Sequence, residues 1–183
     1  MRSGKYIIFF LMLASCLSAE ERVMISLSNN YMLFNDKDYQ NTYGYGSYFP
    51  ELRFSYFLDD NLLIWSGLGL VSNDGNTPVL QLKSSSHQYF ISLGGGYVIN
   101  LYEHVDFISR LGLIWVYYDE NVLTLSESGD SLGIRLDVSL QLAITDMLFI
   151  EISCGYLTAS DKINNKEIDI GGFKTGIDFG IKL

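Results

Sequence analysis

The amino-acid sequence predicts an all-β protein, an eight-stranded antiparallel up-and-down transmembrane β-barrel. Apolar and polar residues alternate with a period of two from residue 23 to the end of the chain, which is typical of strands with one apolar face. Eight such segments are separated by connections that are alternately short and long. Beyond the N-terminal segment no run of about 18 apolar residues occurs, so a membrane helix is not expected.

The composition agrees with an apolar, strand-rich chain. Of the 183 residues, 48% are hydrophobic and 14% are aromatic, whereas only 18% are charged. The 13 Tyr, 11 Phe and 17 Gly against two Pro favour strands joined by tight bends. High apolar content argues against intrinsic disorder. The net charge of −9 argues against a nucleic-acid partner, because phosphate binding needs clustered Lys and Arg.

Residues 1–19 are predicted to be a signal peptide, with 20–183 forming the barrel. Arg2 and Lys5 precede a short apolar stretch, and small residues follow it, as in secretory signals. A second interpretation stays open, because the stretch Leu-Ala-Ser-Cys that ends at Cys16 resembles a bacterial lipobox, in which this cysteine becomes the lipidated first residue. Either cut takes Arg2 and Lys5 from the 12 basic residues. With the cut after residue 19, ten remain against 21 acids, a net charge of −11.

The strands are expected, in order, at 23–34, 48–58, 62–72, 87–100, 105–118, 131–145, 148–159 and 173–183. The alternation is clearest in 131–145, where every even-numbered residue from Leu132 to Ile144 is Leu, Ile or Val. It is ambiguous in 62–72, where both faces carry large apolar residues. Many segments reach the length of about 9–11 residues that a tilted membrane strand needs.

The connections fix the topology of the predicted barrel. The short ones are 59–61, 101–104 and 146–147, and the long ones are 35–47, 73–86, 119–130 and 160–167. Bacterial outer-membrane barrels have short periplasmic turns and longer outer loops. With eight strands, both ends of the chain are then expected on the periplasmic side.

Charge placement favours a barrel with its polar face inside. The polar faces carry five acids and five bases, which we expect to pair as a lumen charge network because an unpaired buried charge costs several kcal/mol: Glu51, Arg53, Asp106, Arg110, Arg135, Asp137, Glu151, Lys174, Asp178 and Lys182. The alternative is a soluble periplasmic ligand-binding barrel, with its apolar face inside.

Aromatic residues are expected in two girdles at the membrane interfaces. One is predicted near the outer ends of the strands, at Tyr31, Phe34, Tyr48, Tyr89, Trp115, Tyr117 and Tyr156. The other is predicted near the inner ends, at Tyr56, Phe57, Tyr97, Tyr102 and Phe149.

On its terminal strand, Thr175-Gly-Ile-Asp-Phe-Gly-Ile-Lys-Leu183, and on the rhythm of its connections, the chain resembles the small eight-stranded outer-membrane barrels of the OmpX/Ail type and the OmpA membrane domain. The resemblance covers residues 20–183. It implies location in the bacterial outer membrane, contact with outer-membrane lipids, and reading of the C-terminal strand by the barrel-assembly machinery. Many such proteins end in an aromatic residue, whereas this chain ends in Leu183, so the subfamily stays open.

No catalytic residue, cofactor or metal is predicted. His87 and His104, the two histidines, fall at opposite ends of one strand and cannot share a site. The lipid A deacylase type of barrel uses a His-x-Ser pair, and the matching stretch His87-Gln-Tyr lacks the serine. The glycines 94–96 lack the lysine of a phosphate-binding loop. Residues 36–38 lack the glycine and terminal Glu of a calcium loop.

The remaining hypotheses concern the interior and the outer loops. Eight strands enclose a lumen that side chains can fill, so we expect a structural or adhesive role, with a narrow porin-like channel as the alternative. The outer loops are predicted to present an acidic surface to an extracellular protein or to cations, with Tyr39, Tyr43, Tyr45 and Tyr48 as contact candidates. This surface holds ten acids (Asp36, Asp38, Asp74, Asp119, Glu120, Glu127, Asp130, Asp161, Glu167 and Asp169) and four bases (Lys37, Lys83, Lys162 and Lys166).

Overall fold

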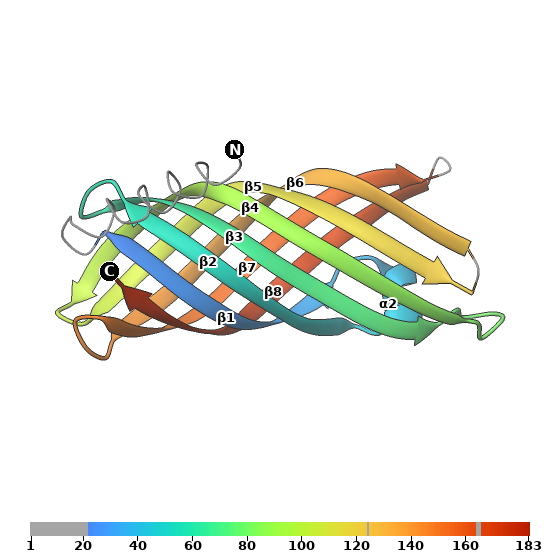
Figure 1. The fold of residues 1–183 in the computed structure, drawn as a ribbon, viewed down its shortest axis with the longest axis horizontal. Coiled ribbons are helices and arrows are strands. Elements are labelled where there is room, and N and C mark those ends of the chain that lie inside the picture. Colours follow the sequence, from blue (N-terminus) through green and yellow to red (C-terminus); the bar gives the residue numbers. More distant parts are fainter. Residues whose placement is uncertain (1–21, 124, 164–165) are drawn as a thin grey trace, which may run out of the picture.

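A computed structural model describes residues 22–123, 125–163 and 166–183 and shows a closed antiparallel barrel (Figure 1). Each strand pairs with its neighbour in sequence, and β1 closes the barrel on β8. The strands are β1 (Val23–Phe34), β2 (Gly46–Phe57), β3 (Leu62–Asn76), β4 (Lys83–Tyr102), β5 (Val105–Val122), β6 (Leu125–Ala143), β7 (Leu148–Ile163) and β8 (Lys166–Lys182). The predicted all-β, eight-stranded, up-and-down architecture is confirmed. Within the described ranges, no helix is both long and apolar enough to cross a membrane.

Three tight turns lie at one end of the barrel, which we call the turn end. They join β2 to β3, β4 to β5 and β6 to β7, as the short connections predicted. In the first of these turns, the Asp59 carboxylate accepts a hydrogen bond from the backbone N–H of Leu62 at 2.7 Å. Both ends of the barrel chain meet here too, since the Val23 N–H donates to the Leu183 carbonyl at 3.0 Å.

At the opposite end, the hairpin end, the strands are longer than the sequence predicted (Figure 1). Most of the expected loops 73–86, 119–130 and 160–167 continue the strand ladders, so their assignment as loops was wrong. Polar residues such as Ser84 and Ser86 occupy these extensions, so the apolar alternation stops. The backbone pairing does not depend on it, and Ser86 still pairs with Glu120 of β5.

The first long connection contains a short helix, α2 (Lys37–Tyr43), where the sequence predicted only a loop. Asp36 caps its N-terminus by accepting a hydrogen bond from the Tyr39 N–H at 2.8 Å. The helix ends at Gly44, whose φ of +94° suits glycine. In Figure 1, α2 lies at the hairpin end of the barrel.

Strand β8 contains two glycines with positive φ, Gly171 at +118° and Gly172 at +155°. A Cβ atom at Gly172 would lie 1.7 Å from the Leu33 carbonyl oxygen of β1. Glycine at this position therefore permits both the backbone conformation and the close approach of β1 that closes the barrel.

We expect Gly172→Ala to lower the free energy of unfolding by about 2–4 kcal/mol, because the new methyl group adds backbone strain and a clash. Gly95→Ala is the matched control, since a Cβ there would meet only the Leu63 carbonyl at 3.8 Å. Its effect should stay within about 1 kcal/mol. Urea-induced unfolding in detergent micelles measures both variants. Equal stabilities for the two variants would contradict the role assigned to Gly172.

Candidate functional site

Eight of the ten predicted lumen charges form one buried network on the inner wall of the barrel. They are four acids and four bases, each exposed by about 1% or less: Glu51, Asp137, Glu151, Asp178, Arg53, Arg110, Arg135 and Lys174. They come from β2, β5, β6, β7 and β8. Because acids and bases are equal in number, the network carries no net charge.

Arg135 is the centre of one half of this network. Its guanidinium donates two hydrogen bonds to Glu51, at 2.6 and 2.8 Å, and a third from Nε to Asp137 at 2.6 Å. The ammonium group of Lys174 lies 3.0 Å from Asp137 and 3.3 Å from Glu51. Two carboxylates are thus shared between two cations, which offsets the cost of removing all four charges from water.

Arg53 and Arg110 form the other half. Nη1 of Arg53 lies 3.0 Å from Glu151 and 2.9 Å from Asp178. Arg110 makes a two-pronged contact with Glu151, at 2.6 and 3.0 Å. The two halves meet where Arg53 approaches Glu51 at 3.5 Å. The network is therefore continuous across the barrel interior.

The remaining two predicted lumen charges lie apart from the network. Asp106 and Lys182 approach one another at 3.8 Å, and their side chains are 23% and 20% exposed. They line a cavity at the turn end together with Arg22, Asp59 and Asp60. This pair is a solvated contact and contributes little to holding the barrel closed.

Apolar side chains fill the interior on both sides of the network. The layer toward the hairpin end includes Met32, Phe34, Phe49, Phe90, Ile114, Val116 and Leu157. The layer toward the turn end consists of Met24, Leu63, Trp65, Val98, Ile108 and Phe149. Phe57 packs against the turn-end layer as well. The placement of Phe34, Phe57 and Phe149 in the outward girdles was therefore wrong. The period of two places Phe34 on the face of Met32 and Phe149 on the face of Glu151, both of which point inward. On β5, both faces are apolar over 113–116, so alternation does not identify the inner face there.

The layers contact the network directly. The Arg135 guanidinium lies over the Trp65 ring at 5.0 Å, and the Lys174 ammonium lies 5.8 Å from the centre of the Phe49 ring. Trp65 also donates a hydrogen bond from its indole to the Gly95 carbonyl at 3.1 Å. The ion network and the two apolar layers on either side of it therefore fill the lumen as one packed core.

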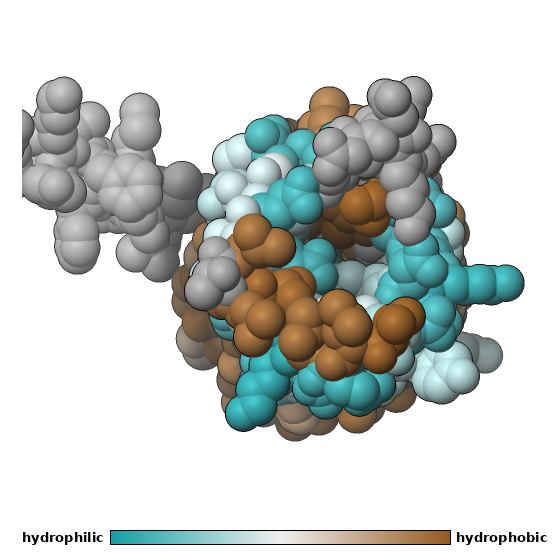
Figure 2. Space-filling model, turned by 90° about the vertical axis from the view of Figure 1, so that its right-hand side faces the viewer, coloured by the Kyte–Doolittle hydropathy of each residue, from teal (hydrophilic) through white to brown (hydrophobic). Residues whose placement is uncertain are grey.

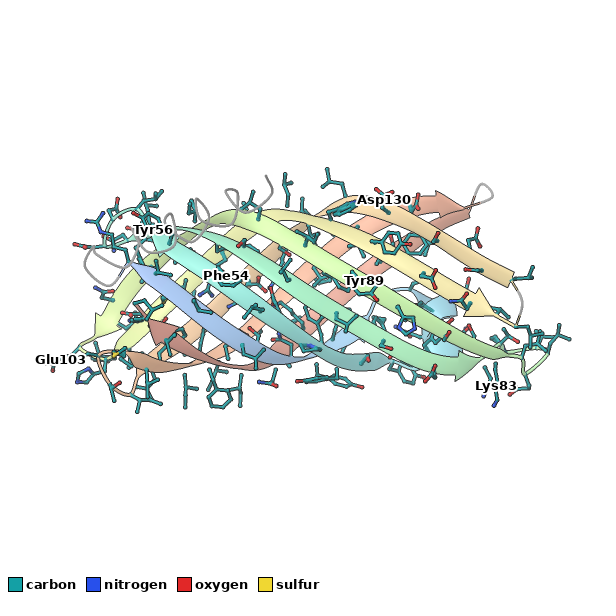
Figure 3. The ribbon with its side chains drawn as sticks, in the orientation of Figure 1. Phe54, Tyr56, Lys83, Tyr89, Glu103 and Asp130 are labelled. Atoms are coloured by element: carbon teal, nitrogen blue, oxygen red, sulfur yellow. The ribbon has the colours of Figure 1, made fainter. Side chains whose placement is uncertain are left out.

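The outer wall is apolar, which is the reverse of the soluble barrel considered as an alternative. Large side chains such as Leu93, Ile134 and Ile152 are 58–66% exposed. Tyrosines and tryptophan border this belt toward the hairpin end, at Tyr31, Tyr48, Tyr89, Trp115, Tyr117 and Tyr156. Figure 3 labels Tyr89 on this half of the barrel, with Tyr56 and Glu103 at the turn end. A continuous exposed apolar surface of this kind suits lipid rather than water.

Two of the four candidate contact tyrosines point into the barrel mouth. The Tyr39 hydroxyl donates to Ser86 and accepts from Asn73, each at 3.1 Å. The Tyr43 hydroxyl donates to Glu120 at 2.7 Å and also contacts Ser84, and the residue is 8% exposed. The expectation that both face outward was therefore wrong, and they hold α2 against the mouth instead.

Tyr45 is 78% exposed, as expected of a contact residue. Tyr48 lies on the outer wall and donates a hydrogen bond to Asn29 at 2.6 Å. Several predicted loop acids are also engaged in the fold. Asp161 accepts from the Tyr118 hydroxyl at 2.6 Å, and Asp130 accepts from the Trp115 indole at 3.0 Å. The side chains of Lys162, Lys166 and Glu167, like Cys16, lie outside the described residues.

The histidines lie at opposite ends of the barrel wall, as predicted. His87 shares a hydrogen bond with Ser72 at 3.0 Å, and Asp119 lies opposite His87 in the ladder. Asp119 accepts from Asn121, and no hydrogen bond joins it to His87 among these described side chains. Nor do three or more His, Cys, Asp or Glu side chains gather for a metal ion anywhere in the described ranges.

Replacing Arg135 with Leu leaves Glu51 and Asp137 short of a buried partner, and we expect a loss of about 3–5 kcal/mol in unfolding free energy. Lys182→Leu removes the partly exposed pair with Asp106 and should cost less than about 1 kcal/mol. Equilibrium unfolding in urea compares the two. Similar losses would mean that the buried network is not the dominant electrostatic contribution.

Burial and the hydrogen bond to Glu120 raise the pKa of Tyr43 above its ordinary value of 10.0. The neutral phenol is therefore favoured when α2 is docked. The resulting contribution to the free energy of unfolding is constant below pH 10 and is lost as the pH rises through the folded-state pKa. Glu120→Gln should lower the pKa of Tyr43, whereas Asp60→Asn at the turn end should not. Tyrosine ¹³Cζ NMR resolves this titration, and an unchanged pKa in Glu120→Gln would refute the assigned cause.

Neither a protein-family model nor a curated protein matches this sequence. Solved structures do match. OprG from Pseudomonas aeruginosa is 13% identical with a TM-score of 0.69, and the match covers 88% of this chain and 95% of OprG. Neisserial surface protein A is 10% identical with a TM-score of 0.62, over 88% and 96% of the two chains. Ail of Yersinia pestis is 15% identical with a TM-score of 0.55, over 88% and 99%. The chain therefore has the fold of the small eight-stranded outer-membrane barrels.

Proposed function

We propose that this chain is an exported bacterial outer-membrane barrel with a structural or adhesive role, and that its hairpin end is the interacting surface. The observation that carries the proposal is the filled lumen. Eight buried, mutually paired charges lie between two apolar layers, which leaves the interior to hold the barrel together. Any partner then contacts the outer surfaces of the barrel.

The apolar outer wall supports the membrane location. Its belt of exposed aliphatic side chains and its bordering aromatics fit a lipid bilayer and its interface. In this setting outer-membrane lipids are the immediate partners, and the alternating strand that ends at Leu183 is the segment offered to the barrel-assembly machinery. Residues 1–19 would direct export as a signal peptide, or Cys16 would anchor the mature chain through a lipid.

The tips of two hairpins support an adhesive role. Val79 and Leu80, between β3 and β4, are 88% and 71% exposed. Leu123, which follows β5, and Leu125, the first residue of β6, are 67% and 76% exposed. Figure 2 faces this end and shows hydrophobic side chains beside the opening with hydrophilic ones around them. We call these four residues the tip patch. Exposed apolar groups of this size, standing clear of the outer wall, are suited to protein contact.

The charge at this end indicates the kind of partner. Asp74 and Glu127, both exposed, lie on the same hairpins as the tip patch. Ail has been crystallised with the heparin analogue sucrose octasulfate, a polyanion. Acidic side chains such as Asp74 and Glu127 beside the tip patch disfavour such a ligand here. They favour a partner that combines apolar and basic groups.

Amine-bearing polystyrene beads combine these two properties and provide a defined probe. Cells that display the chain should retain more beads than cells that lack it. A variant with Ser at all four positions of the tip patch should lose most of this difference, because the apolar contact is removed. The control variant Leu58→Ser/Met147→Ser changes exposed apolar residues at the turn end and should behave as wild type. Unchanged retention by the tip variant would contradict the adhesive role.

Two further measurements separate the alternatives. Unheated and boiled samples should migrate differently on a denaturing gel, as folded membrane barrels do, whereas a mature chain that stays soluble without detergent would contradict the membrane location. The filled lumen predicts no discrete conductance steps in planar bilayers. Discrete conductance steps from the wild-type chain would favour the narrow channel instead.

A further inference from the structure

The part of β6 nearest the hairpin end has a paired strand on one side only. Within the described ranges, the ladder between β6 and β7 begins at Gly133 and Ala159, whereas the ladder between β5 and β6 continues to Leu125. Beyond this point β7 pairs with β8 alone, as far as Ile163. In Figure 1 the β5–β6 and β7–β8 hairpins accordingly diverge at this end. Residues 125–132 therefore form a free strand edge, which we call the β6 edge.

Every second residue of the β6 edge directs its backbone groups toward the gap. At the far end of the strand, the Ala143 N–H donates to the His104 carbonyl on the β5 side. The next residue, Ile144, donates instead to the Leu148 carbonyl on the β7 side. Backbone N–H and C=O groups alternate in direction along a strand, and the register of β5 with β6 runs without a shift, so the even-numbered residues face away from β5. At the β6 edge these exposed residues are Ser126, Ser128 and Asp130.

The fold covers the corresponding edge on β3. This strand continues beyond its ladder with β2, which ends at Gly69, and α2 lies against the extension. Asn73 donates to the Tyr39 hydroxyl of α2 at 3.1 Å. A Cβ atom at Gly75 would lie 2.1 Å from the Thr42 carbonyl oxygen. Proteins commonly cover a free edge in this way, or protect it with Lys or Pro. The β6 edge contains neither residue, and α2 packs on the β3 side of the mouth.

The side chains of the β6 edge indicate what can pair with it. Its two charged residues, Glu127 and Asp130, are both acidic, and Figure 3 labels Asp130 on this part of β6. Leu125 of the tip patch stands at the end of the edge. Pairing with the β6 edge of a second copy would bring like charges together, which disfavours it. A basic strand gains opposite-charge pairs and an apolar contact with the tip patch.

We propose that the β6 edge binds an extended, basic segment of a partner protein by strand addition. The segment forms backbone hydrogen bonds with Ser126, Ser128 and Asp130. Its Lys or Arg side chains lie beside Glu127 and Asp130, and its apolar residues reach the tip patch. This inference rests on the proposed role of the hairpin end as the interacting surface. It adds the conformation of the partner, because a strand edge binds the backbone of an extended chain.

An octapeptide of alternating Lys and Val, blocked at both ends, is the probe. It is titrated into the barrel in phosphatidylcholine nanodiscs and followed by amide NMR, and we expect saturable shifts in 125–132. The same peptide with every backbone amide N-methylated keeps its charges and side chains but loses its N–H donors. It should bind at least about tenfold more weakly. Equal binding of the two peptides would overturn the proposal, as would the absence of saturable shifts in this segment.

Two substitutions at one residue test the edge itself. Ser128→Pro removes an N–H group that faces the gap and leaves the ladder with β5 intact, because this N–H points away from β5. Ser128→Ala loses the same hydroxyl but keeps the N–H, and is the matched control. Ser128→Pro should weaken octapeptide binding several-fold, whereas Ser128→Ala should bind as wild type. Equal binding by the two folded variants would refute the assignment, and if Ser128→Pro fails to fold, the two peptides still decide.

The results also separate this inference from the adhesive role. If the tip-patch variant loses bead retention while the two peptides bind equally, adhesion stands and strand addition is refuted. If the tip-patch variant retains beads as wild type does while only the unmethylated peptide binds, the adhesive role of the tip patch is contradicted and the β6 edge stands as a binding site.

Discussion

The pairing of buried charges across the lumen is the interaction on which the rest of this barrel depends. The partners are distant in sequence: Glu51 and Arg135 are separated by 84 residues, and Arg53 and Asp178 by 125. A single one of these groups buried alone would be strongly destabilising, since desolvation of an unpaired charge is not offset. Only the closed barrel brings all eight together. Strand closure and charge pairing therefore stabilise each other.

Small residues make room for the network. A Cβ atom at Gly67 would lie 2.3 Å from a Glu51 oxygen, and one at Gly155 would lie 2.1 Å from an Asp137 oxygen. Long charged side chains on one strand thus lie over glycine on the next. The two apolar layers then exclude water from the charges, which strengthens each pair. The buried ion pairs therefore fit inside this eight-stranded barrel only because glycine stands beside them.

The two ends of the molecule differ in structure, and the filled lumen separates them. The turn end has tight connections and both chain ends, whereas the hairpin end has extended ladders, the docked helix α2, the tip patch and the β6 edge. Tyr39 and Tyr43 connect α2 to the wall and so close the mouth.

The sequence by itself determined the strand count, the up-and-down order and the inner face of most strands, because a period of two records which side each residue faces. It also identified all eight network charges, since charged residues within otherwise apolar alternation are costly unless paired. Only the tertiary structure decided which charge pairs with which, because partners meet through closure rather than through spacing. Phe34 and Phe149 share a period-two register with the inward Met32 and Glu151, so the alternation itself indicates their inner face. The tertiary structure alone decided the ladders over 119–130, where polar residues occupy both faces, and the docked tyrosines of α2, which lie outside the strands.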